Sequence, residues 1–404
     1  MQRAENAASL SERSTLNRGL LAVLAFAAGL TVANNYYNQA MLGLLADEFR
    51  LSPATVALLP VLTQLGNVVG IFFLVPLGDR LERRWLILVT TIALVAALVA
   101  AAIAPGFVWL VVAGLGIGLF ATVTQQIVPL AVHLSASHER GHVLGIVTGG
   151  ILVGILLART ISGVISDLWG WQAVFWTAAA FMLATAVALG TMLPKVEPTS
   201  DLSYGRLLGS LWTLLRTHRV LRWGVATQAL IFAAFIGFWS SLALLLDGPP
   251  YDLGATAVGL VALVGVGGAL AAPIAGALAD KRGPAVVISI GAGLVVVAFA
   301  IFGLFQGSLA AIVIGVLVLD LAVQASQVAN QARIFALDPA ARSRLNTIFM
   351  GTMILGGACG AGVAGLAYAC FGWTGACIFG ATAAAIALVM SRAEARDKVS
   401  KWSR

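Results

Sequence analysis

Two charged residues lie inside long apolar stretches of the sequence, where charge is rare. Asp320 is the one acidic residue of seventeen that lies near the middle of such a stretch, and Arg159 is its basic counterpart in another. A charge in hydrocarbon costs several kcal/mol, so residues of this kind usually face a cavity and serve a function. A carboxyl group can bind and release a proton, and a guanidinium group can bind an anion.

Asp320 is predicted to bind and release a proton as part of the protein's function. Burial disfavours the charged form of a carboxyl group and a nearby arginine favours it, so a residue under both influences can exchange its proton as its surroundings change. Contact with a substrate without protons and a structural ion pair stay open as other roles. Arg159 is expected to bind an anionic group of the substrate, to tune Asp320, or to brace the helices.

Amide and aromatic side chains in the same apolar runs form a candidate binding surface for a small molecule. Asp320, Gln324 and Gln327 recur at helical spacing on one face. Each single amide is equally well explained by hydrogen bonding between helices, so the prediction rests on their concentration. The candidates beside Arg159 and Asp320 are Asn34, Tyr36, Tyr37, Gln39, Gln64, Gln125, Gln126, Gln228, Trp239, Gln324 and Gln327.

The composition indicates a membrane protein. The chain is 60% hydrophobic and 10% charged, with a mean hydropathy of +0.97. A soluble domain has no use for that much apolar surface. The runs between charged turns reach about 20 residues or more, enough to cross a hydrocarbon core of about 30 Å as helix. We predict an all-α integral membrane fold with transmembrane helices over residues 20–45, 56–77, 85–104, 107–134, 143–168, 171–193, 221–246, 257–278, 284–304, 309–333, 345–371 and 375–391.

The two halves of the chain repeat each other. A charged turn around Asp79 recurs 201 positions later around Asp280, and Gly170-Trp171 recurs 202 positions later as Gly372-Trp373. Duplication at this period in so hydrophobic a chain is typical of membrane transporters. We therefore predict a six-helix bundle over 1–193, a linker over 194–220 and a second six-helix bundle over 221–404. The leucines and arginines of the linker suit an amphipathic helix on the membrane surface, although a plain linker suits them nearly as well.

Charge predicts the orientation. With the N-terminus inside, 22 of the 24 lysines and arginines fall on the inner side, only Arg50 falls outside, and Arg159 lies within a span. This bias places both termini in the cytoplasm of a multi-pass protein of the bacterial inner membrane. It also accounts for the net charge of +7 through contact with the lipid bilayer, so no nucleic-acid partner is expected. We expect a monomer.

Enzyme chemistry is not expected. The sequence has no nucleotide-binding loop, nucleophile triad or metal cluster. His133, His138 and His142 crowd one predicted loop, where solvated side chains are a better explanation than a metal site. We predict no cofactor and no bound metal.

The turn at residues 79–84 resembles the loop motif of the major facilitator superfamily, and the resemblance covers about residues 15–395. Asp79, Arg80, Arg83 and Arg84 match that motif, whereas Val75 and Glu82 stand where the family has glycine. The second copy keeps Gly276, Asp280 and Lys281. The resemblance implies that Asp79, Arg80, Arg83, Arg84, Asp280 and Lys281 form a cytoplasmic gate, made in one conformation and broken in the other.

Two shorter segments, 33–39 and 154–163, are similar to bacterial efflux permeases for drugs or sugars. Helix 5 has the glycines of the superfamily's antiporters but lacks their Gly-Pro signature. We expect a secondary active transporter that works by alternating access and exports a small organic molecule in exchange for protons. Import of a small, anionic metabolite at Arg159 is the alternative, and a membrane sensor that transports nothing is the second alternative.

Overall fold

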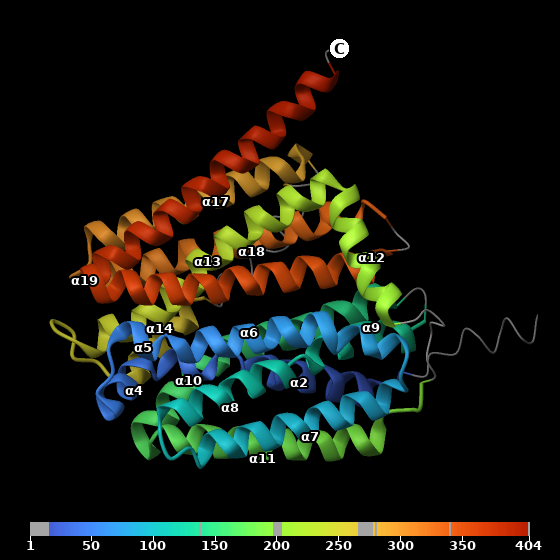
Figure 1. Ribbon diagram of the computed structural model, residues 1–404, viewed down its shortest axis with the longest axis horizontal. Helices are drawn as coiled ribbons and strands as arrows, with labels where there is room; N and C mark the ends of the chain where they lie inside the picture. Colours follow the sequence, from blue (N-terminus) through green and yellow to red (C-terminus); the bar gives the residue numbers. More distant parts are fainter. Residues whose placement is uncertain are drawn as a thin grey trace, which may run out of the picture.

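The protein is built from helices that run side by side in two layers, with the first half of the chain below the second in Figure 1. The computed structural model describes residues 16–136, 139–196, 204–265, 278, 281–338 and 341–402. Within these ranges every regular element is a helix.

The first half contains eleven helical elements in the described ranges. They are α2 (Arg18–Ala33), α3 (Tyr37–Ala40), α4 (Leu42–Phe49), α5 (Pro53–Val56), α6 (Leu58–Phe73), the 3-10 helix η1 (Val75–Asp79), α7 (Arg83–Ala102), α8 (Phe107–Phe120), α9 (Val123–Leu134), α10 (Arg140–Trp169) and α11 (Trp171–Met192).

The second half contains fewer described elements, because residues 266–277 fall outside the described ranges. Its helices are α12 (Tyr204–Thr217), α13 (Arg219–Asp247), α14 (Ala255–Val264), α17 (Pro284–Leu304), α18 (Leu309–Phe335) and α19 (Arg342–Trp402).

Each predicted span has a helical counterpart. In the described part of the chain, nine helical segments are long and apolar enough to cross a membrane, and one of them, Arg344–Glu394, holds the last two predicted spans. Two shorter apolar helices, α2 and α14, lie where the first and eighth spans were predicted. The last helix continues past its predicted end at residue 391 to Trp402.

The repeated Gly-Trp pairs form equivalent turns. Gly170 separates α10 from α11 with φ of 82°, and Gly372 interrupts α19 with φ of 61°. Only glycine adopts positive φ without a steric penalty, so both halves use it to reverse the chain between their last two spans.

The first span is broken, contrary to the continuous helix predicted over 20–45. Backbone bonds after Ala33 tighten to three-residue spacing, as in Asn34 N to Thr31 O at 3.3 Å. The Asn34 side chain also donates from Nδ2 to Leu30 O, at 2.8 Å. An asparagine that competes for the helix's own carbonyl groups ends the regular helix, and the short helices α3 and α4 follow.

The span predicted over 107–134 is also divided, into α8 and α9. The Thr122 hydroxyl group donates to Leu119 O at 3.0 Å, which takes a carbonyl from the helical ladder at the break. Gln125 and Gln126 follow the break, in the first turn of α9.

The linker contains the predicted amphipathic helix, α12. Its apolar face was expected to lie on the membrane surface, but it packs on other helices of the protein. Leu211 and Leu214 of α12 are buried in a cluster with Leu221 of α13 and Phe349 of α19. The start of α12 reaches the first half, where the Tyr204 hydroxyl group donates to Phe73 O at 2.8 Å. The helix therefore connects the halves instead of lying free on the membrane surface.

Candidate functional site

Arg159 lies at the centre of a buried site formed by both halves of the chain. Arg159 lies in the middle of α10, and only 2% of its surface is exposed. Its Nε donates to Gln39 Oε1 of α3 at 2.9 Å, because the break in the first span turns this short helix toward α10. Gln39, from the first predicted span, therefore contacts Arg159 directly.

Three aromatic rings surround the Arg159 guanidinium group. Its Cζ lies 4.9 Å from the ring centroid of Tyr36, 4.3 Å from that of Trp239 and 5.8 Å from that of Phe235. Stacking of this kind stabilises a cation through the ring faces, while it leaves the edge of the guanidinium free to donate. The Nη2 atom of Arg159 is buried and has no hydrogen-bond partner.

Asp320 lies close enough to Arg159 for the two charges to interact. No ion pair within 4.0 Å joins them in the described structure, and the Oδ2 atom of Asp320 is buried without a hydrogen-bond partner. The carboxyl group packs against the end of α14, where a Cβ atom added to Gly265 would lie 2.6 Å from Oδ2. The site thus presents a cation and a carboxyl group that are near each other and individually unsatisfied.

Backbone contact between α10 and α14 closes the site on one side. The Thr160 hydroxyl group, next to Arg159, donates to Gly259 O at 2.7 Å. A Cβ atom at Gly259 would lie 2.7 Å from Thr160 Cα, and one at Gly163 would lie 2.3 Å from Ala255 O. Only glycine permits helices from the two halves to approach this closely.

Asp167 extends this contact to the far end of α10. Its Oδ1 accepts from Ala255 N at 3.1 Å and its Oδ2 accepts from Thr256 N at 2.7 Å. These are the first amides of α14, which have no partner inside their own helix. A carboxylate from one half therefore caps a helix of the other half, with a favourable helix dipole.

Several predicted amides are buried with unused donors. Gln39, Gln64 and Gln228 each have an Nε2 atom without a partner, and the Trp239 Nε1 atom is also unpaired. Gln228 accepts from Asn330 Nδ2 at 3.2 Å, which ties α13 to α18. These free donors are the kind of group that a polar ligand would satisfy.

Other predicted residues lie elsewhere or serve the fold. The Asn34 amide binds its own helix, and Tyr37 lines an apolar groove between α2, α10 and α11. Gln324 and Gln327 of α18 are half-buried, and among the described residues the hydrogen-bond and ring partners of Arg159 are Gln39, Tyr36, Phe235 and Trp239. A role for these four side chains in a site with Arg159 stays a prediction.

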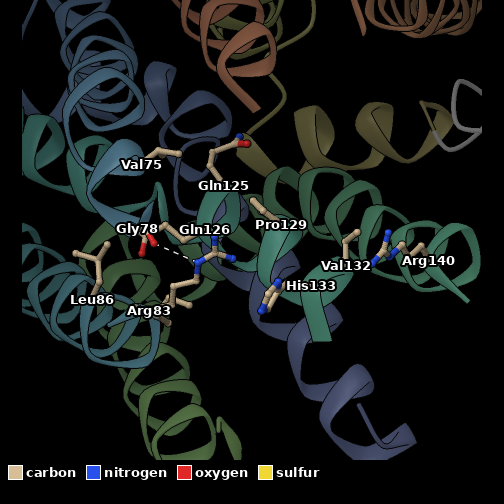
Figure 2. A pocket seen from close by; sticks show the side chains of 11 residues that line it. Val75, Gly78, Arg83, Leu86, Gln125, Gln126, Pro129, Val132, His133 and Arg140 are labelled. Carbon is tan, nitrogen blue, oxygen red and sulfur yellow. Dashed lines mark hydrogen bonds between the residues drawn. The ribbon is translucent and has the colours of Figure 1, made fainter. Parts of the chain in front are cut away.

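Gln125 and Gln126 line a second cavity of about 330 Å³. Figure 2 shows them with Arg83, His133 and Arg140 around this cavity, which is built from η1, α7, α9 and the start of α10. All of its lining residues lie between positions 75 and 140, so it belongs to one half of the chain and is separate from the site at Arg159.

The predicted gate residues are only partly described. Arg83 donates from Nε to Gly78 O at 3.1 Å, and Arg84 donates to Gly190 O of α11. Asp79 ends η1, Arg80 and Lys281 are exposed, and Asp280 lies outside the described residues.

Glu82, which replaces the glycine of the family motif, caps α7. Its Oε1 accepts from Arg84 N at 2.9 Å and its Oε2 accepts from Trp85 N at 3.0 Å. This departure from the motif thus supplies a helix N-cap, which stabilises the start of α7.

Phe235 and Asp167 were not predicted from the sequence. Phe235 lies four residues before Trp239, and this aromatic pair at helical spacing was a signal that both rings share a face. Asp167 lies at the end of a predicted span, and nothing in its sequence neighbourhood indicates its partners on α14. Within the described ranges, no three His, Cys, Asp or Glu side chains lie together as a metal site would require.

Comparison with known proteins identifies a family. The model of the Major Facilitator Superfamily matches residues 24–318 and 249–401. An uncharacterised transporter of Escherichia coli O157:H7, YgaY, is 37% identical over 93% of this chain and 95% of its own length. A probable transporter of Streptomyces coelicolor, SCO4007, is 31% identical over 89% of this chain and 84% of its own. The crystal structure of the nucleoside transporter NupG aligns with a TM-score of 0.75 over 92% of this chain and 98% of that one, at 14% identity.

Proposed function

Because this chain belongs to the major facilitator superfamily, it is a multi-pass secondary transporter and not an enzyme, and we propose that it carries a small organic anion together with protons. The anionic group binds Arg159 and the apolar part of the substrate contacts Tyr36, Phe235 and Trp239. The proton binds Asp320. Both termini face the cytoplasm of a bacterial inner membrane, as the charge bias favours.

The single observation that carries this proposal is the unsatisfied Arg159 guanidinium group. It is buried, its Nε atom is held by Gln39, and its Nη2 atom has no partner. An unpaired donor on a buried cation costs free energy that a bound carboxylate would recover. A cationic substrate would meet electrostatic repulsion at the same place.

Proton coupling follows from the position of Asp320. An anion bound at Arg159 adds negative charge beside the carboxyl group, and this favours the protonated form of Asp320. Linkage is reciprocal, so protonation of Asp320 strengthens anion binding by the same factor. Proton and anion then bind together, and an inward proton gradient drives uptake.

A second candidate is efflux of a neutral, drug-like or sugar-like molecule in exchange for protons. The free Nε2 atoms of Gln39, Gln64 and Gln228 and the free Oδ2 atom of Asp320 favour it, because a hydroxyl-bearing solute would satisfy them. Such a solute would bind the ionised carboxylate and compete with the proton. Competition between substrate and proton produces antiport instead of cotransport.

Alternating access would use the contact between α10 and α14 as one gate. Residues 1–193 and 221–404 would rock as two units about the site at Arg159. The bonds of Thr160 and Asp167 to α14 hold one end closed. The turns around Asp79 and Asp280, with Arg80, Arg83, Arg84 and Lys281, would close the opposite end in the other conformation.

The experiment is a flux screen in sealed proteoliposomes, with labelled monocarboxylates and dicarboxylates beside labelled sugars. We expect uptake of at least one carboxylate that Arg159→Gln abolishes and that Arg392→Gln, on the exposed end of α19, leaves unchanged. Transport of sugars alone, with an outward preference under an inward proton gradient, would favour the second candidate. An absence of flux for every solute would favour a sensor.

A further inference from the structure

Acidic side chains from both halves of the chain lie close together at the end of the bundle that the charge bias predicts to face outside. This is the end where α4 and α14 lie, on the left of Figure 1. Asp247, the last residue of α13, is half-buried at the centre of the group. Its acidic neighbours are Asp47 of α4, Asp167 of α10 and Asp252 of the loop after α13. Tyr368 of α19 also lies within range of its charge.

Asp247 is in direct contact with α4 of the first half. A Cβ atom added to Gly43 of α4 would lie 2.6 Å from Asp247 Cγ and 2.7 Å from its Oδ2, so the carboxyl group approaches the α4 backbone as closely as a glycine permits. Asp47 follows Gly43 by one helical turn and therefore lies on the same face of α4. The Asp47 and Asp247 side chains are hydrogen-bonded to each other. This bond joins the two halves.

A hydrogen bond between two carboxyl groups requires a bound proton. An ionised carboxylate only accepts hydrogen bonds, so one member of the pair must be protonated in order to donate. The neighbouring Asp167 is different, because it accepts from Ala255 N and Thr256 N at 3.1 and 2.7 Å and is favoured there as an anion. The Asp47–Asp247 pair is thus a place where the folded protein holds a proton between its halves.

Within the described ranges, no cation replaces this proton. Arg50 is the one lysine or arginine that the charge bias places outside, and it is exposed after the end of α4, with no described ion pair within 4.0 Å. Loss of the shared proton would leave two carboxylates side by side, with Asp167 and Asp252 nearby. Like charges repel most strongly at short distance, so the repulsion is largest where the halves are together.

We propose that the Asp47–Asp247 pair is a proton-dependent latch at the outer end of the protein, in which a proton shared by the two carboxyl groups holds the halves together. The closed conformation holds a proton that the open one releases, so acid outside favours the closed conformation and alkali favours the open one. This proton enters and leaves on the same side and is not carried across the membrane. The latch therefore regulates opening of the outer end, whatever substrate binds at Arg159.

The test measures the distance across the outer end of the full-length protein in nanodiscs, by pulsed measurement between spin labels at Val108 of α8 and Leu304 of α17. Both positions are exposed, and they lie at the outer ends of helices from different halves. The three native cysteines are replaced by alanine so that only these positions are labelled. We expect the ratio of closed to open conformations to rise at least about fivefold from about pH 8 to about pH 5, as is typical of linked equilibria.

Asp47→Asn should keep the outer end closed and remove the pH response, because an amide donates to Asp247 without a titrating proton. Asp47 is exposed, so this substitution leaves the packed core unchanged. Glu48→Gln is the matched control, since it removes the adjacent exposed acid of α4, and it should keep the full response. Asp320→Asn should keep the response as well, because the latch is separate from the central site.

Three results would overturn the proposal. One is a ratio of closed to open conformations that does not change with pH in the unchanged protein. Another is a pH response in Asp47→Asn equal to that of the unchanged protein. The third is loss of the response in Asp320→Asn, which would assign the proton to the central site. The distances are measured without substrate, so none of these results bears on whether Arg159 binds an anion, and the two proposals can fail separately.

Discussion

The Arg159 guanidinium group stacks on the Trp239 ring at 4.3 Å, and the two residues come from opposite halves of the chain. Arg159 belongs to α10 and Trp239 to α13, so any motion that separates the halves changes this contact. A cation that is held by rings and by one amide keeps its remaining donors for a ligand. This arrangement links substrate binding to the relative position of the halves.

Trp239→Leu should weaken substrate binding while the protein still inserts. A cation–π contact at a desolvated site contributes about 1–2 kcal/mol, so the half-saturating concentration should rise about 5- to 30-fold. The matched control is Trp212→Leu, because exposed Trp212 of α12 also stacks with an arginine, Arg216, at 4.7 Å. Equal effects of the two substitutions on transport would contradict a specific role for Trp239.

Gly265→Ala should impair proton coupling through a steric effect on Asp320. The new Cβ atom would lie 2.6 Å from Oδ2, so the carboxyl group must move. We expect the pH response of transport to fall at least about tenfold, because a displacement of about 1 Å at a reacting group has effects of that order or larger. Gly293→Ala is the control, since a Cβ atom there meets nothing within 4 Å. A normal pH response in Gly265→Ala would show that Asp320 tolerates the displacement.

Asp167→Asn should loosen the contact between α10 and α14. The loss of a charged cap costs about 0.5–2 kcal/mol, which increases the population with the two helices apart about 2- to 30-fold. Spin labels at the exposed positions Leu168 of α10 and Leu260 of α14 would report this population by pulsed distance measurement. Glu48→Gln removes an exposed acid from α4 and should leave the distances unchanged. Unaltered distances in Asp167→Asn would mean that the cap does not hold this end closed.

Glu82→Gly, which restores the residue of the family motif, should lower stability and preserve transport. The substitution removes both cap bonds to the start of α7. Because glycine is itself tolerated at a helix N-cap, we expect a loss of only about 0.3–0.5 kcal/mol, measured as a slightly lower thermal midpoint of the detergent-solubilised protein. The exposed Glu48 again supplies the control, as Glu48→Gln, because a glycine inside α4 would itself cost about 1 kcal/mol. An unchanged midpoint in Glu82→Gly would show that water satisfies these amides equally well.

Much of the fold could be predicted because hydrocarbon imposes simple rules on the sequence. The apolar runs predicted each span, and the positive φ of Gly170 and Gly372 gives a physical reason for the repeated Gly-Trp pairs. The break after Ala33 was not predictable from hydropathy, because it depends on the Asn34 side chain competing with the backbone. The same break directs Gln39 toward Arg159.

Site residues could be predicted from the sequence only where burying their charge costs so much free energy that the residue must face a cavity. Arg159 and Asp320 are of this kind, since a charge within a span needs a cavity. The position of Gln126 beside Arg83 and His133 could not be predicted, because burial of an amide does not say which face of a helix it occupies. Asp167 was missed because its partners are backbone amides of α14, 88 and 89 positions away.

The central claim is that Arg159 binds the anion and Asp320 binds the proton that moves with it. The most direct measurement records carboxylate uptake and proton uptake together in proteoliposomes, for the unchanged protein and for Asp320→Asn. We predict that the unchanged protein takes up protons with the carboxylate, and that Asp320→Asn exchanges carboxylate across the membrane without any proton movement. Carboxylate-linked proton uptake that persists in Asp320→Asn would contradict the account.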